Sequence, residues 1–176
     1  PFDGLGDLGK RVLRTPASAT QSFSDDPLRM MRAARFASQL NFEIDEEVLS
    51  AMSSMASRIS IISAERVREE FTKLLMSPNP RIGITILVDT GIAELVLPEI
   101  PKLRLEIDEH HHHKDVYEHS ITVLEQAIAQ EERLGGPNLV IRLAALLHDI
   151  GKPKTRNLLE GGGVSFHHHE VVGARL

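Results

Sequence analysis

Asp26 and Arg29 stand three residues apart, and two side chains at that spacing project from one face of a helix. Pro27 fits the first position of such a helix, because its missing N–H would have had no partner there, and Asp26 is a residue type that caps helix starts. A carboxylate beside a guanidinium places an acceptor next to a planar donor fork. Such a pair can read cytosine or adenine, which present an amino donor beside a bare ring nitrogen, and refuse uracil and guanine. The alternative is that Asp26 is only a cap and Arg29 only a solvated helix charge.

A second group of chemically capable residues contains His119, His148 and Asp149. His148-Asp149 closes an apolar helix that we expect over residues 139–149, and His119 falls on the apolar stripe of an earlier helix. Imidazole nitrogens with a carboxylate suit divalent first-row metals better than Ca²⁺ or Mg²⁺. A carboxylate in the last turn of a helix is disfavoured by up to about 1 kcal/mol, and a bound cation would remove that conflict. Taken alone, His119 also fits a hydrogen-bonded core residue.

Further motifs surround Asp26. They are Pro1-Phe2-Asp3-Gly4 with Gly6-Asp7-Leu8 and Arg11-Val12-Leu13-Arg14, then Asp25-Asp26-Pro27-Leu28-Arg29, and then the run from Ile62 to Phe71. Together they resemble the CCA-adding tRNA nucleotidyltransferase family, in which an E-D-x-x-R motif at the start of the neck reads the base. Asp25 stands where the family has Glu. The resemblance implies that Asp26 and Arg29, with Arg32 on the same polar side of the helix, bind CTP and ATP.

Motifs in the second half lie at His113 to Ser120, at Leu147 to Pro153, and at Phe166 to His169 with Gly173-Ala174. They resemble the HD phosphohydrolase superfamily, and more closely the HD domain attached to many bacterial CCA-adding enzymes. The resemblance implies that the metal ligands are His119, His148 and Asp149, and that the ion is a divalent transition metal (Ni, Mn, Fe, Co or Zn). It implies further contacts to phosphate or a second metal from Lys152, Arg156 and His169.

Two details qualify the metal site. The superfamily's final Asp ligand normally lies further downstream than Leu176, which leaves the site one ligand short. Lys152 and Arg156 also fit a simpler role as charges at a helix C-terminus. Consecutive residues point in different directions, so the run His110 to His113 cannot supply a whole site, and we expect one of its members to have a supporting role.

The elements that must position these residues are helical. The periodicity predicts an all-α fold, with a helical neck (25–100), a truncated helical HD domain (101–176) and a β-like remnant of a head domain in residues 1–24. Helices are expected over 27–40, 45–57, from 63, over 82–88, over 115–134 and over 139–149, with a linker at Pro98 to Pro101. The spacing also predicts ion pairs Arg66–Glu70 and Glu69–Lys73.

Composition excludes several classes of function. The 176 residues include no cysteine, which excludes disulfides, thiolate metal sites and cysteine nucleophiles. A net charge of −5 and an aromatic content of 4% argue against a general nucleic-acid binder, so any RNA contact must come from a local basic patch. No apolar run reaches membrane-spanning length and no signal peptide is visible, which favours a soluble cytoplasmic protein without a membrane partner. The sequence carries no signal for an oligomeric state.

The leading hypothesis is part of an enzyme that adds CCA to tRNA 3′ ends from CTP and ATP. The family's head holds Mg²⁺ with two aspartates, and no D-x-D motif occurs here, so we expect no catalytic residue for nucleotidyl transfer in this chain and no polymerisation by it alone. Three alternatives stay open. They are a bacterial poly(A) polymerase of the same family, a metal-dependent HD phosphohydrolase acting on cyclic nucleotides or phosphodiesters, and a non-catalytic RNA-binding module.

Overall fold

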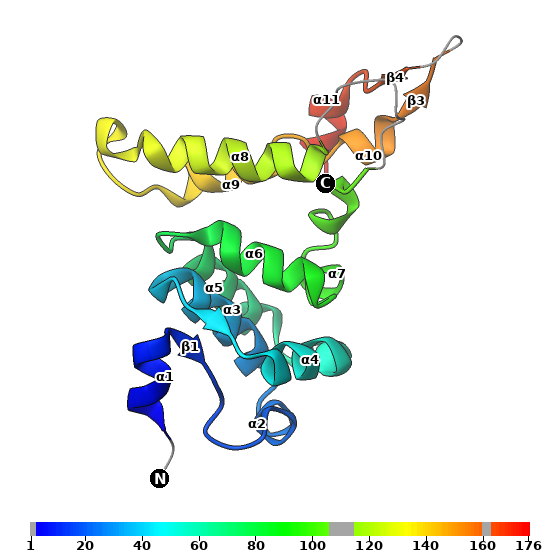
Figure 1. The fold of residues 1–176 in the computed structure, drawn as a ribbon. Helices are drawn as coiled ribbons and strands as arrows, with labels where there is room; N and C mark the ends of the chain where they lie inside the picture. Colours follow the sequence, from blue (N-terminus) through cyan, green and yellow to red (C-terminus); the bar gives the residue numbers. More distant parts are fainter. Residues whose placement is uncertain (1–2, 106–114, 160–162) are drawn as a thin grey trace. The chain divides into compact units, whose positions relative to one another are not determined.

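The computed structural model describes residues 3–105, 115–159 and 163–176, and it is mostly helical (Figure 1). The all-α prediction is therefore confirmed. The chain divides into two compact units, Pro1–Val96 and Leu97–Leu176, and the division adjoins the expected linker. No helix among the described residues is long and apolar enough to cross a membrane. The run of four histidines at 110–113 lies outside the described residues.

The first unit is built around α3, which packs against both α5 and α6. Met30, Met31, Ala34 and Ala37 of α3 are almost fully buried and form the centre of its core. The elements of this unit are α1 (Gly4–Lys10), β1 (Val12–Leu13), α2 (Ala19–Asp25), α3 (Leu28–Leu40), β2 (Glu43–Ile44), α4 (Glu46–Met55), η1 (Ala56–Ile61), α5 (Ala64–Leu75), α6 (Pro80–Asp89) and α7 (Ala93–Val96).

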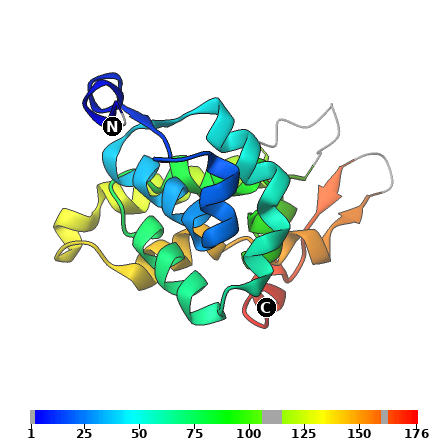
Figure 2. The same cartoon turned by 90° about the horizontal axis from the view of Figure 1, so that it is seen from below.

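Residues 1–24 lie within this first unit. β1 pairs in parallel with β2, with Val12 opposite Glu43 and Leu13 opposite Ile44. α2 packs against α4, as the view from below shows (Figure 2). The Ser18 hydroxyl accepts a hydrogen bond from the Gln21 N–H and caps α2. The periodicity did not predict α1 and α2 because each has only seven residues, rich in Gly or Ser.

The ion pairs of α5 differ in part from the expected set. Glu69 and Lys73 form the predicted pair, with 3.8 Å between the ammonium and the carboxylate. Glu70 instead pairs with Arg35 of α3, whose Nε lies 2.7 Å from Oε2. The predicted Arg66–Glu70 pair is therefore wrong, because the packing of α3 on α5 gives Glu70 a closer, buried partner.

The second unit is a pair of adjacent helices, α8 and α9, followed by smaller elements (Figure 1). Tyr117, Ile121 and Leu124 of α8 are buried with Leu146 of α9. The helix expected to reach residue 134 ends at Ala129 and continues as a 3₁₀ turn. The elements are η2 (Pro101–Leu103), α8 (Val116–Ala129), η3 (Glu131–Leu134), α9 (Leu139–Leu147), α10 (Lys152–Thr155), β3 (Asn157–Leu158), β4 (Val164–Ser165) and α11 (His169–Gly173).

Candidate functional site

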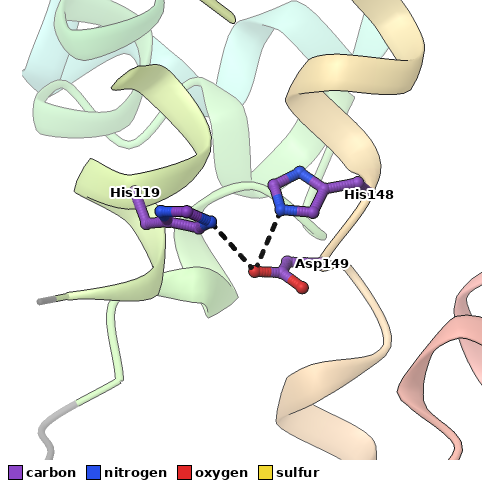
Figure 3. Close-up of side chains that lie close together, drawn as sticks. All are labelled: His119, His148 and Asp149. Carbon is purple, nitrogen blue, oxygen red and sulfur yellow. Dashed lines mark ion pairs between the residues drawn. The ribbon is translucent and has the colours of Figure 1, made fainter. Parts of the chain in front are cut away.

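The chain places His119 of α8 beside His148 and Asp149, which follow the end of α9 (Figure 3). Asp149 Oδ2 lies 3.2 Å from His148 Nε2 and 3.9 Å from His119 Nε2. One ligand atom from each residue lies within 4.8 Å of the other two. Ligand atoms around a tetrahedral Zn²⁺ stand about 3.4 Å apart, given ion-to-ligand distances of about 2.1 Å. The separations from Asp149 are close to this value, so the three side chains could hold one ion after small movements.

Local sequence features set this geometry. The Asp115 carboxylate accepts from the Tyr117 N–H at 3.1 Å and so fixes the start of α8 one turn before His119. Asn138 caps α9 by accepting from the N–H groups of Val140 and Ile141 at 2.9 and 3.1 Å. Both helices are thereby anchored at their N-termini, and their packing brings the metal-binding residue types together.

A buried ion pair holds the far end of the two helices. Arg142 donates from Nε to Glu131 Oε1 at 2.6 Å and from Nη2 to Oε2 at 2.7 Å, and both side chains are buried. The Arg142 guanidinium holds the pKa of the Glu131 carboxyl below its usual value, and a hydrogen bond from the Asn138 N–H acts in the same direction against the effect of burial. This pair ties η3 to α9.

Burial separates the roles of the three grouped residues. The Asp149 side chain is 3% exposed, whereas the exposed fractions are 46% for His119 and 35% for His148. His119 is therefore not the buried core histidine that the sequence left as an alternative. A buried carboxylate below two accessible imidazoles is suited to hold a cation that a ligand from solvent can still reach.

A neighbouring carbonyl group determines that Nδ1 of the His148 ring carries a hydrogen. His148 Nδ1 lies 2.9 Å from the carbonyl oxygen of Ala145, and a carbonyl only accepts, so Nδ1 carries the hydrogen. The other ring nitrogen, Nε2, faces the carboxylate of Asp149 at 3.2 Å. An ion placed there would meet one imidazole nitrogen and one carboxylate oxygen, a ligand set typical of divalent first-row metals. The chemistry of the donor set therefore fits a metal ion.

His169 and Lys152 also reach Asp149. His169 Nε2 lies 3.4 Å from Oδ1, and its Nδ1 donates to the carbonyl oxygen of Phe166 at 2.9 Å. Lys152 Nζ lies 2.7 Å from Oδ2. Arg156 is exposed at the end of α10. The structure thus brings two of the three residues expected as additional contacts to the carboxylate itself.

Close backbone packing places α11, and with it His169, beside Asp149. A Cβ atom at Gly151 would overlap the carbonyl oxygen of His169 and lie 2.7 Å from the Gly173 nitrogen. Only glycine leaves room for this approach of α10 and α11. The glycine after His148-Asp149 thus positions a third imidazole.

The residues expected to bind nucleotide lie at the start of α3. Asp26 Oδ1 accepts from the Leu28 N–H at 3.1 Å, which is the predicted capping bond, and its Oδ2 pairs with Arg66 Nη2 at 2.9 Å. Arg29 Nη1 donates to the hydroxyl and the carbonyl oxygen of Ser22 at 3.1 and 3.3 Å. In the described part of the chain, Asp26 and Arg29 form no salt bridge with each other. The structure therefore gives each member of the pair a separate internal partner.

A cavity of about 520 Å³ opens beside Arg29 and Arg32. Arg14 and Phe36 are among its other lining residues, and the Arg35 guanidinium lies 4.1 Å from the centre of the Phe36 ring. The cavity therefore combines several guanidinium groups with an aromatic face. Sequence reasoning missed Arg14 and Ser22 here because they precede α3 in an apparently irregular segment.

Two protein-family descriptions match separate parts of the chain. The description "Probable RNA and SrmB-binding site of polymerase A" matches residues 41–103, and "HD domain" matches residues 116–176. The A-adding tRNA nucleotidyltransferase of Deinococcus radiodurans is 37% identical over 182 residues, which cover 100% of this chain and 41% of that protein. The multifunctional CCA protein of Neisseria meningitidis is 38% identical over 159 residues, which cover 88% of this chain and 36% of that protein.

A solved structure is similar to this chain in fold. The crystal structure of Bacillus stearothermophilus CCA-adding enzyme in complex with CTP matches with a TM-score of 0.58 and 28% identity, over 83% of this chain and 36% of that one. This chain spans about two fifths of the length of the curated relatives it matches.

Proposed function

Because this chain belongs to the CCA-adding tRNA nucleotidyltransferase family and carries its RNA-binding region and HD domain, we propose that it supplies the base-reading neck of an enzyme that adds CCA to tRNA 3′ ends from CTP and ATP. The observation that carries the proposal is the start of α3, where Arg29 and Arg32 line one cavity and Asp26 caps the helix beside them. The Mg²⁺ ions of nucleotidyl transfer would be held by carboxylates outside these 176 residues, which contain no D-x-D motif.

The roles within the neck follow from charge. Arg29 donates to the ring nitrogen of cytosine or adenine, and Asp26 accepts from the amino group once its pair with Arg66 opens. Arg14 and Arg32 add positive charge to the cavity wall, which favours the triphosphate. A two-bond edge contact is worth only roughly 1–3 kcal/mol by analogy with base readout in DNA. Because the metal ions that hold the triphosphate would be bound outside these residues, we expect this chain alone to bind neither CTP nor ATP at micromolar concentration.

The test is nucleotide incorporation into tRNA by the full-length protein that carries this chain. Arg29→Ala should reduce CTP and ATP incorporation and weaken discrimination against UTP. Arg133→Ala, an exposed arginine in the second unit, is the matched control and should leave both unchanged. An Arg29→Ala enzyme that still excludes UTP as well as the unaltered protein does would refute the base-reading role.

The Deinococcus radiodurans relative, which aligns with the whole chain, favours a second candidate with narrower activity, because its name specifies addition of A. Supplying tRNA that lacks CCA and tRNA that ends in CC separates the two. A CCA-adding enzyme extends both, whereas an A-adding enzyme extends only the second. Long homopolymeric A tails on either substrate would instead indicate a poly(A) polymerase.

For the second unit we propose a divalent transition-metal centre held by His119, His148 and Asp149, with phosphate monoesters, phosphodiesters or cyclic nucleotides as substrates. When bound, the ion supplies an activated water for phosphoester hydrolysis. Asp149 supplies the negative charge of the site, and the contact of His148 Nδ1 with the Ala145 carbonyl orients the ring so that Nε2 faces Asp149. His169 approaches the opposite carboxylate oxygen, where it can contact phosphate or a second ion.

Metal content and hydrolysis test this centre together. The purified chain, loaded with Mn²⁺, should hydrolyse a generic phosphodiester, and Asp149→Asn should abolish both metal retention and hydrolysis. Metal binding should weaken in acid, because an imidazole binds metal only when it is neutral. Metal retention without hydrolysis of any phosphoester would leave a structural metal site in an RNA-binding module and refute the hydrolase.

A further inference from the structure

Lys152 lies closer to Asp149 than His119, His148 or His169 does. Its ammonium is 2.7 Å from Oδ2, the oxygen that His148 and His119 also face, at 3.2 and 3.9 Å. The lysine side chain is 22% exposed and the carboxylate only 3% exposed. The ammonium therefore contacts the same carboxylate oxygen that a metal ion held by these histidines would contact.

The buried carboxylate needs a cation when no metal is bound, because an isolated buried charge is strongly unfavourable. His148, His169 and His119 lie farther from the carboxylate than Lys152 does, at 3.2, 3.4 and 3.9 Å. Lys152 is the only lysine or arginine that pairs with Asp149 among the described residues. The fold thus provides an internal counter-ion.

A metal ion at the same oxygen would stand close to that ammonium. With ion-to-oxygen distances of about 2.1 Å, and the lysine kept in place, the two cations would be roughly 4 Å apart. Like charges at such distances disfavour one another. The ring of Phe166, whose centre lies 5.6 Å from Nζ, offers the ammonium a second resting place.

We propose that Lys152 is a counter-ion that the metal must displace from Asp149, so that the lysine stabilises the metal-free second unit and lowers its metal affinity. The displaced ammonium then moves toward the ring of Phe166. This inference rests on the proposed metal centre and adds a residue that regulates its occupancy.

The test compares Lys152→Met, which keeps the length of the side chain and removes its charge, with Lys154→Met, which removes an equal charge from an exposed position two residues away. Free Mn²⁺, measured by electron paramagnetic resonance, gives the affinity. Mn²⁺ is chosen because it competes weakly for the histidine runs of this chain. The fluorescence of Tyr117, the only tyrosine in a chain without tryptophan, reports unfolding of the second unit.

Lys152→Met should bind Mn²⁺ roughly tenfold more tightly or better, as expected for removal of a like charge at this distance. In the presence of EDTA its second unit should melt at a lower temperature, and Mn²⁺ should raise that temperature more than in the unaltered protein. Lys152→Arg, which keeps the charge, should stay near the unaltered affinity, and Lys154→Met should change neither measurement.

Unchanged or weaker Mn²⁺ binding by Lys152→Met would overturn the inference. If Lys152→Met folds only with Mn²⁺, the counter-ion role is supported, because the metal then replaces the missing charge. Asp149→Asn separates this result from the parent proposal. Mn²⁺ binding that does not depend on Asp149 refutes the metal centre, whereas Asp149-dependent binding unaffected by Lys152→Met refutes only the counter-ion.

Discussion

Replacing Arg142 with Met isolates the energetic role of the buried pair that ties η3 to α9. The substitution keeps an unbranched side chain and removes both charge-assisted hydrogen bonds to Glu131, at 2.6 and 2.7 Å. The carboxylate is then left with the Asn138 N–H, 3.3 Å from Oε1. We therefore expect the second unit to be destabilised by a charge that is buried without a partner.

The magnitude follows from the geometry. Breaking a buried pair by removing one partner costs about 3–5 kcal/mol, and we expect the lower value because the remaining N–H still compensates part of the charge. A unit of this size has a stability of roughly 4–12 kcal/mol. The variant should stay folded at neutral pH with a clearly lower urea midpoint. Glu131→Gln with Arg142→Met, which removes both charges, should recover most of the loss.

The pH dependence of the unfolding free energy gives a sharper test, because its direction differs between the unaltered protein and Arg142→Met. In the unaltered protein Arg142 lowers the pKa of the Glu131 carboxyl. The stabilisation that this pair contributes is fully present above the unfolded pKa of about 4.3, and it is lost as pH falls through the lower pKa of the folded protein. In Arg142→Met the buried carboxyl should have a raised pKa, so the variant should gain stability as pH falls toward 4.3.

Urea titrations followed by Tyr117 fluorescence between pH 7 and pH 4.5 measure both proteins in the unit that contains the pair. The difference in unfolding free energy between them should be greatest at pH 7 and shrink in acid. A difference that stays constant over this range would refute the assignment of the loss to an unpaired Glu131 and attribute it to lost packing.

Three further changes test other contacts. Gly151→Ala should displace α11, lowering both the melting temperature and the Mn²⁺ affinity, whereas Gly173→Ala, whose added Cβ would be 3.3 Å from its nearest neighbour, should do so much less. Ser120→Ala should stabilise the second unit by about 1 kcal/mol in urea titration, because the buried Ser120 hydroxyl has no hydrogen-bond partner among the residues that the structure describes. Arg66→Ala should change the unfolding free energy by less than about 1 kcal/mol, because the ion pair that it removes is exposed. The substitution should nevertheless alter CTP and ATP incorporation by the full-length protein, because it releases the Asp26 carboxylate from its partner. Unaltered incorporation would show that Asp26 acts only as a cap.

Local sequence patterns predicted the features that depend on near neighbours. The helix start at Asp26 and Pro27 has a local cause, and so does the Glu69–Lys73 pair, four residues apart on one helix. Burial at a helix end is harder to predict: the apolar Leu40 is 50% exposed at the last position of α3.

Contacts between distant residues could not be predicted in this way. Arg35 and Glu70 are 35 positions apart, and Asp26 and Arg66 are 40 apart, so no periodicity relates them. His119 and Asp149 were grouped by the chemistry of their side chains and by resemblance to a family, because no spacing rule relates residues 30 positions apart. The nearness of Lys152 to Asp149 has a local basis, since a lysine three residues after a carboxylate can reach it across a tight turn.

Three of the residues proposed to bind ligands share one property, which is that the fold already gives them an internal partner of suitable charge or polarity. Asp26 has Arg66, Arg29 has the oxygens of Ser22, and Asp149 has Lys152. These partners keep half-buried charges satisfied while no ligand is bound, so the ligand-free chain stays folded. Each binding event is then an exchange of partners, and its net free energy is smaller than the new contacts alone suggest. Tight binding must therefore come from groups that approach an additional charge, such as the triphosphate or the metal ion, rather than from the base edge.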